Sequence, residues 1–194
     1  MLYYFPGEFS PANKYDKKIA EWLSNKTHDV SEVVVVIGKS KDGEMTGEQK
    51  YDLWNQYLLN NKQANISIYK DDKNSPLTAI YKLQERLPED AFGIALPEKI
   101  AKNKDFQEVF AMFPNYEVII TPPYEDGVSE SMMEALAEDD LRKFIKGLPP
   151  ELSMDAKKEI FDSLKPEKVE EEGVLSERYW RDMLSGMYNR YGLK

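Results

Sequence analysis

Apolar residues occur along the first two thirds of the chain as short runs, separated by segments with helical periodicity. Val33–Ile37 is five consecutive β-branched residues followed by Gly38, a pattern typical of a central strand covered on both faces. Parallel strands need helical crossovers between them, and the intervening segments supply these. The pattern therefore predicts a Rossmann-like, doubly wound α/β domain with a five-stranded parallel sheet. The other four expected strands are Leu2–Phe5, Asn65–Tyr69, Ala91–Leu96 and Tyr116–Thr121.

Several of the intervening helices have recognisable starts. The first is expected over Asp16–Leu23, where apolar residues recur at helical spacing. Thr46, with Gln49 three residues later, has the form of a capping box. Ser75, followed by Pro76, is typical of an N-cap with proline at the first helical position. These signals place a helix in each of the first three crossovers.

From Ser129 onward the pattern is helical only. One apolar stripe runs from Met132 to Ile145 and is broken by Pro149-Pro150, and a second helix is expected over Met154–Leu164. We therefore expect a first domain over residues 1–165. Residues 166–194 are expected to hold an acidic linker and a helical C-terminal extension.

The C-terminal extension carries an aromatic stripe that the core fold does not need. Tyr, Trp, Met and Arg are enriched in interface cores, so the stripe is a candidate interface. Packing on its own domain and docking on a partner, including a second copy of the chain, both remain open. The candidate interface residues are Tyr179, Trp180, Met183, Met187, Tyr188 and Tyr191.

Composition narrows the classes of function. The formal net charge is −9, which disfavours a nucleic-acid partner. The chain has no cysteine, which excludes disulfides, thiolate zinc sites and a cysteine nucleophile. No apolar run approaches the roughly 20 residues of a membrane helix, and the first residues lack the pattern of a signal peptide. We expect a protein of the cytoplasm, of a cell or an infected host, or of a virion.

The segment after the first strand contains Gly7, Phe9 and Pro11 in the spacing Gly-x-Phe-x-Pro. This resembles the first signature of the cytidylyltransferase-like nucleotidylyltransferases, in which two histidines three residues apart follow. In this sequence the two histidine positions fall on Asn13 and Asp16.

The second signature of that family is Ile-Ser-x-Thr-x-x-Arg, at the start of a helix after the last strand. Residues 128–134 stand in the corresponding place: Ser129 matches, Ser131 is a mild change and Glu134 replaces the arginine. The resemblance covers about residues 1–165, and the compact form is similar to variants carried by bacteriophages.

The resemblance implies an enzyme that joins a nucleotide α-phosphate to a phosphorylated acceptor, with the histidines and the arginine stabilising the triphosphate. Asn13 carries no charge, and Asp16 and Glu134 would place anions beside that triphosphate. We therefore expect a degenerate, non-catalytic binding, assembly or structural module, with a protein or a second copy as partner, no cofactor and at most weak nucleotide binding. The alternative is an active adenylyl- or cytidylyltransferase that uses Lys14, Lys17 or Lys143 and magnesium.

The geometry of the cleft distinguishes these two hypotheses. Asp16 facing Glu134 across an acidic pocket favours the first, and lysines converging on a phosphate site favour the second. Lys14, Lys17 and Lys18 begin the first helix, where they form either an anion site or a solvated face.

The remaining polar candidates are given structural roles. Ser129 and Ser131 are expected to be N-caps. His28, the only histidine, is expected in a surface loop. The acidic runs Asp71-Asp72, Asp139-Asp140 and Glu170–Glu172 match no calcium loop, so we expect no metal site.

Overall fold

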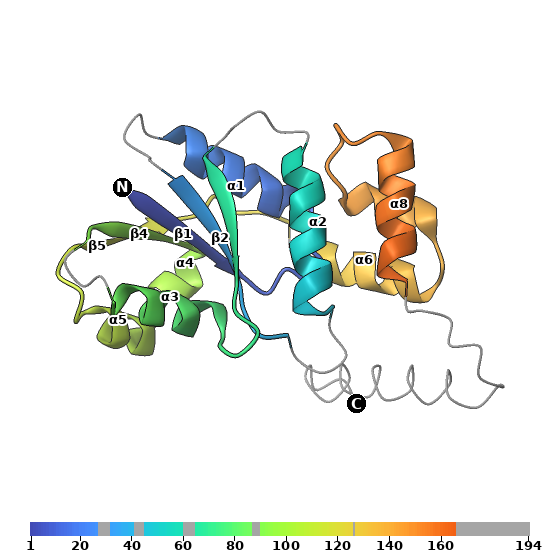
Figure 1. Ribbon diagram of the computed structural model, residues 1–194. Helices are drawn as coiled ribbons and strands as arrows, with labels where there is room; N and C mark the ends of the chain where they lie inside the picture. Colours follow the sequence, from blue (N-terminus) through green and yellow to red (C-terminus); the bar gives the residue numbers. More distant parts are fainter. Residues whose placement is uncertain (27–31, 41–44, 60–64, 87–89, 126, 166–194) are drawn as a thin grey trace, which may run out of the picture.

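The computed structural model describes residues 1–26, 32–40, 45–59, 65–86, 90–125 and 127–165. Its sheet has five parallel strands in the order β3-β2-β1-β4-β5 (Figure 1). The prediction of a doubly wound, parallel five-stranded sheet is confirmed. The strands are β1 Leu2–Gly7, β2 Glu32–Ile37, β3 Ile66–Lys70, β4 Phe92–Leu96 and β5 Tyr116–Ile120.

The predicted central strand is internal. β2 pairs in parallel with β1 on one side and β3 on the other, so that Val34 lies between Tyr4 and Ser67. β1 is longer than expected, because Pro6 and Gly7 continue the register with β2. β4 pairs with β1 only over Leu2–Tyr4, so β1 has a single neighbour beyond that point. A proline, which lacks an N–H, is tolerated where one side of the strand is unpaired.

The crossovers contain α1 Lys14–Lys26, α2 Gly47–Leu59, α3 Pro76–Gln84, α4 Glu98–Ala101 and α5 Lys104–Phe110. Two predicted helix starts are confirmed. Thr46 and Gln49 exchange the two hydrogen bonds of a capping box, at 2.9 and 3.2 Å. Ser75 caps α3 ahead of its proline.

The alternation of side chains along the strands produces two cores. Val33 and Val35 lie in the core on the side of α1 and α2, whereas Val34 and Val36 lie in the core formed with α3, α4 and α5. The helices after β5 extend the first of these cores. Figure 1 shows them beside α2, at one end of the sheet.

The C-terminal third of the described chain consists of α6 Val128–Ala137, α7 Leu141–Phe144, a 3-10 turn Ile145–Gly147 and α8 Met154–Leu164. α8 matches the predicted range. The apolar stripe from Met132 to Ile145 does not lie on one helix, as the sequence suggested. Asp139 adopts a φ of 55°, which ends the first helix, and Asp140 caps a new one. The acidic linker and the C-terminal stripe lie outside the described residues. Within the described residues, no helix combines the length and apolarity of a membrane span.

Candidate functional site

The first signature forms the β1–α1 loop. Phe9 is buried there against Phe5 and Trp54, with ring centroids 5.4 and 5.2 Å away. The ring of Phe9 folds back over Gly7, where an added Cβ would lie 2.4 Å from it. Gly7 is therefore needed for close packing, which gives the Gly-x-Phe spacing a structural reason independent of catalysis.

Asn13 and Asp16, at the two histidine positions, together form the N-terminal cap of α1. The Asn13 Oδ1 atom accepts hydrogen bonds from the N–H groups of Tyr15 (2.8 Å) and Asp16 (3.4 Å). In return, the Asp16 carboxylate accepts the N–H of Asn13 at 2.8 Å. This reciprocal arrangement is a capping box. Both side chains are thus engaged in starting the helix.

Ser129 connects the two signatures. The Asn13 amide donates to Ser129 Oγ at 2.9 Å, and this hydroxyl donates to the carbonyl oxygen of Pro11 at 2.8 Å. The prediction that Ser129 and Ser131 are N-caps is wrong. The N-cap of α6 is Gly127, with a φ of 80°. Glycine is itself a favourable N-cap residue, so the sequence did contain a signal for this start.

The electrostatics of the capping box depend on Asp16, which is partly buried. Burial raises the pKa of Asp16 from 3.8 to about 7, although the hydrogen bond from the Asn13 N–H acts in the opposite direction. Burial, followed by the charges of Asp16 and Glu151, raises the pKa of Tyr57 well above its usual range. The Tyr57 hydroxyl remains a donor and binds the carbonyl oxygen of Ala12 at 2.7 Å.

The candidate anion-binding lysines have different environments. Lys17 is 5% exposed, and its ammonium contacts Glu21 at 2.6 Å and also Glu151. Burial lowers the pKa of Lys17, but the hydrogen bonds to Glu151 and Glu21 outweigh burial and raise it overall. The charge of Lys17 is therefore used within the protein. Lys18 is exposed, with its Nζ 5.8 Å from the centre of the Tyr15 ring.

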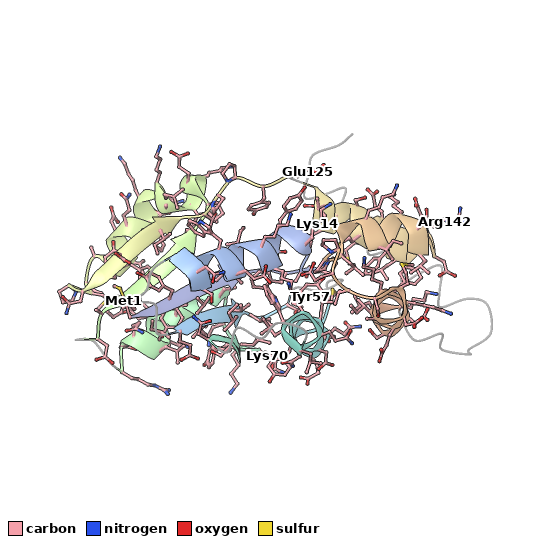
Figure 2. The ribbon with its side chains drawn as sticks, turned by 90° about the horizontal axis from the view of Figure 1, so that it is seen from above. Met1, Lys14, Tyr57, Lys70, Glu125 and Arg142 are labelled. Carbon is pink, nitrogen blue, oxygen red and sulfur yellow. The ribbon has the colours of Figure 1, made fainter. Side chains whose placement is uncertain are left out.

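Further contacts join the start of α1 to the segments before and after α6. Lys14 Nζ lies 5.2 Å from the centre of the Tyr15 ring and donates to the carbonyl oxygen of Lys146 at 3.1 Å. The Tyr15 hydroxyl donates to Glu125 at 2.7 Å. Lys14 and Glu125 are both labelled in Figure 2. The protein's own side chains thus join the start of α1 to the segment just before α6 and to the 3-10 turn after α7.

Glu134, at the arginine position, is exposed on α6 and binds Lys143 at 3.0 Å. The hydrogen bond with Glu134 raises the pKa of Lys143; desolvation acts in the opposite direction but is outweighed, with a further contribution from the hydrogen bond to Glu138. Asp16 accepts the Asn13 N–H, whereas Glu134 pairs with Lys143. Each of the three lysines of the enzyme hypothesis contacts protein groups of its own: Lys14 the Lys146 carbonyl oxygen, Lys17 two glutamates and Lys143 two others.

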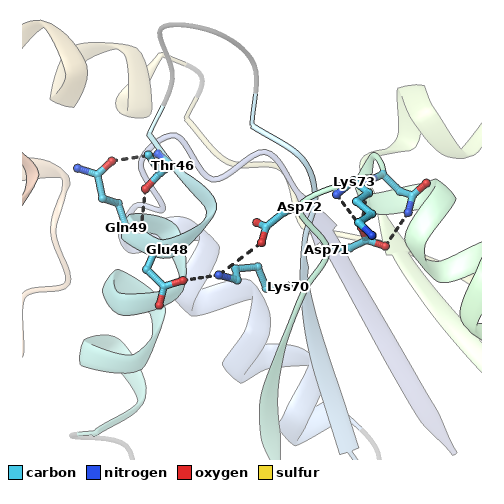
Figure 3. Close-up of polar contacts among 8 residues, drawn as sticks. Thr46, Glu48, Gln49, Lys70, Asp71, Asp72 and Lys73 are labelled. Carbon is cyan, nitrogen blue, oxygen red and sulfur yellow. Dashed lines mark hydrogen bonds and ion pairs between the residues drawn. The ribbon is translucent and has the colours of Figure 1, made fainter.

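The acidic pair after β3 has a structural role (Figure 3). The Asp71 carboxylate accepts the N–H groups of Lys73 and Asn74, at 2.8 and 3.0 Å, and so closes a turn. Asp72 lies 3.6 Å from Lys70, which also pairs with Glu48. No group of three or more metal-binding side chains occurs in the part of the chain that the structure describes.

The other acidic run that the structure describes follows α6. Asp139 pairs with Lys165 at 2.7 Å, and Asp140 caps α7. His28 and Glu170–Glu172 lie outside the described residues.

No protein-family model and no curated protein matches the sequence. Among solved structures, it is similar to the Plasmodium falciparum nicotinic acid mononucleotide adenylyltransferase complexed with NaAD, with a TM-score of 0.58. The match covers 83% of this chain and 97% of that chain, at 17% sequence identity. The chain has a nucleotidylyltransferase-like fold. At this identity the similarity establishes the fold alone, so what this protein does must be argued from its own residues.

Proposed function

We propose that this protein is a non-catalytic relative of the nucleotidylyltransferases that acts as a binding, assembly or structural module. The hydrogen-bond network of Asn13, Asp16 and Ser129 carries the proposal. Its polar groups cap α1 and join the two signature segments, so the side chains at these positions are engaged with each other.

The charges at these positions support the same conclusion. Phosphoryl transfer depends on positioning and on cationic stabilisation of the transferred group. An ionised Asp16 would repel a phosphate charge placed about 4 Å away by about 4 kcal/mol at an effective dielectric constant of 20. Lys17, the buried cation on the same helix, is already balanced by Glu21 and Glu151.

The partner expected for such a module is a protein or a second copy of the chain. The bacteriophage-like compact form extends the proposal to a virion or host-interaction protein. The competing proposal is an active nucleotidylyltransferase. It uses Lys14, Lys17 or Lys143 with magnesium. Lys14 and the candidate anion-binding residue Lys18 lie on the first turns of α1, near a helix terminus that favours anions.

Calorimetric titration with ATP and CTP, each with magnesium, tests the proposal together with a pyrophosphate-release assay. Nicotinic acid mononucleotide is the first acceptor to use, because the similar solved structure is an adenylyltransferase for it. We expect no saturable heat and no pyrophosphate above the protein-free rate. Pyrophosphate release that saturates with substrate and is lost in the variant Lys14→Ala/Lys18→Ala would establish the enzyme instead.

A positive control comes from the same chain. The triple variant Asn13→His/Asp16→His/Glu134→Arg restores the cationic side chains of both signatures. Provided that circular dichroism shows it to be folded, ATP binding by this variant alone would identify the three positions as the cause of inactivity. Equal ATP binding by the wild type would contradict the proposal.

A further inference from the structure

A groove of about 280 Å³ lies between α2 and α8, which run side by side in Figure 1. Its lining includes three buried apolar residues, Leu53 from α2 and Ile160 and Leu164 from α8. Gln49 and Asp52 of α2 are among its polar residues. Small-molecule sites typically measure about 300–1,000 Å³. The volume therefore suits a few inserted protein side chains better than a cofactor.

Leu59 lies at the end of α2, three residues beyond Gln56, which lines the groove. Asp52, Gln56 and Leu59 follow each other at spacings of four and three residues, so they lie on one side of the helix. Leu59 is 81% exposed, the highest value among the large apolar residues that the structure describes. A single exposed leucine is ordinary on a protein surface. At the end of a groove-lining stripe, however, it is a contact that another segment could cover.

The chain itself can supply that segment. Leu164 lines the groove, and the sequence continues beyond the described residues from position 166 to 194. The eight residues 166–173 can span at most about 26–29 Å. α2 has 13 residues and is about 20 Å long. The linker is therefore long enough to bring residues 174–194 to any point along α2.

The chemistry of residues 174–194 matches the groove. Their apolar residues recur at spacings of three and four, which is the spacing with which an amphipathic helix binds in a groove between two other helices. The segment is basic in a chain of net charge −9: it has Arg178, Arg181, Arg190 and Lys194 against Glu177 and Asp182. α2 and α8 each contain one more acidic than basic residue, and Asp52 lines the groove itself.

We propose that residues 174–194 dock in the α2–α8 groove of the same molecule, with part of their apolar stripe on Leu53, Leu164 and Leu59. This docking does not depend on whether the protein is an enzyme. It makes the C-terminal extension an internal ligand of the domain.

Cross-linking tests the proposal directly, because the natural sequence has no cysteine. Gln56→Cys on α2 is combined in turn with Tyr179→Cys, Met183→Cys and Met187→Cys in the full chain, followed by mild oxidation. We expect at least one pair to form a disulfide within one chain, at a rate independent of protein concentration. The matched control replaces Gln56→Cys by Lys99→Cys, an exposed position on α4 at the other face of the sheet. It should form intrachain disulfides several-fold more slowly.

A second measurement uses no cross-link. Leu59→Asp should lower the melting temperature of the full chain more than Met112→Asp, since both residues are exposed but only Leu59 lies on α2, three residues beyond the groove-lining Gln56. Disulfides formed only between chains would assign the groove to a second copy and overturn the proposal. Cross-linking no faster than the control, or equal melting shifts for the two aspartate variants, would also overturn it.

Discussion

Replacing Asp16 by asparagine should stabilise the protein, and increasingly so as the pH rises. The asparagine side chain keeps an oxygen that can accept the Asn13 N–H, so the capping box retains its geometry. What the substitution removes is a charge held in a partly buried place. The variant therefore separates the role of Asp16 as a cap from the cost of its ionisation.

The magnitude follows from the pKa. Burial raises the pKa of Asp16 from 3.8 to about 7, so the folded state binds the proton more tightly than the unfolded state. Below pH 3.8 both states are protonated and the difference vanishes. Between the two pKa values stability falls as pH rises, and above pH 7 the full cost is present. At about 1.4 kcal/mol per pKa unit the cost is about 4 kcal/mol, and access of water to the carboxylate reduces it to about 2–4 kcal/mol.

Urea unfolding, followed by tryptophan fluorescence at pH 5, 6, 7 and 8, measures this effect. We expect the stability gain of Asp16→Asn to be about 1–3 kcal/mol larger at pH 8 than at pH 5. Asp155→Asn is the matched control, because Asp155 occupies the first turn of α8 and is exposed. A gain that does not change with pH, or a loss of stability at pH 8, would refute the assignment of a buried charge to Asp16.

Three further predictions concern the same loop and the C-terminal extension. Asn13→Ala should lower the free energy of unfolding by about 1–3 kcal/mol more than Asn103→Ala, which removes the N-cap of α5, since only Asn13 also binds Ser129. Equal losses in the two variants would contradict a stabilising hydrogen bond between Asn13 and Ser129. Gly7→Ala should cost about 1–3 kcal/mol by overpacking against Phe9, and an unchanged melting temperature would be inconsistent with that contact. Truncation after Glu172 should lower the melting temperature without changing the oligomeric state in solution. A change from an oligomer to a monomer would indicate docking on a partner, and no change in either melting temperature or oligomeric state would mean that the segment does not pack.

Much of the fold could be predicted because its signals are local. The unbroken β-branched run of β2 marks a strand buried on both faces, and the serine before α3 and the proline that begins it fix its first turn. The break between α6 and α7 could not be predicted from the stripe of apolar residues, which continues across it. That break depends on the backbone of Asp139, a non-glycine residue in the left-handed region.

The site was only partly predictable, for a similar reason. The motif spacing located Asn13 and Asp16. An asparagine followed by an acidic residue three positions later is also a helix-capping signal, but the family resemblance identifies these two positions only as replaced histidines. The bond from Asn13 to Ser129 joins residues 116 positions apart, and the pairing of Lys17 with Glu151 joins residues 134 positions apart. Contacts of that range follow from the completed fold, in which the loop after β1 meets the helices after β5.

The three hydrogen bonds of the Asn13 side chain have a consequence for how the two signatures tolerate mutation. One oxygen serves two backbone N–H groups while the amide nitrogen serves Ser129, and few other side chains combine that acceptor and donor at this length. Position 13 should therefore accept few residue types in a saturation mutagenesis screen scored for folding. Glu134, exposed and paired only at the surface, should accept many. Selection for folding alone would therefore keep the residue at position 13 and let the residue at position 134 vary.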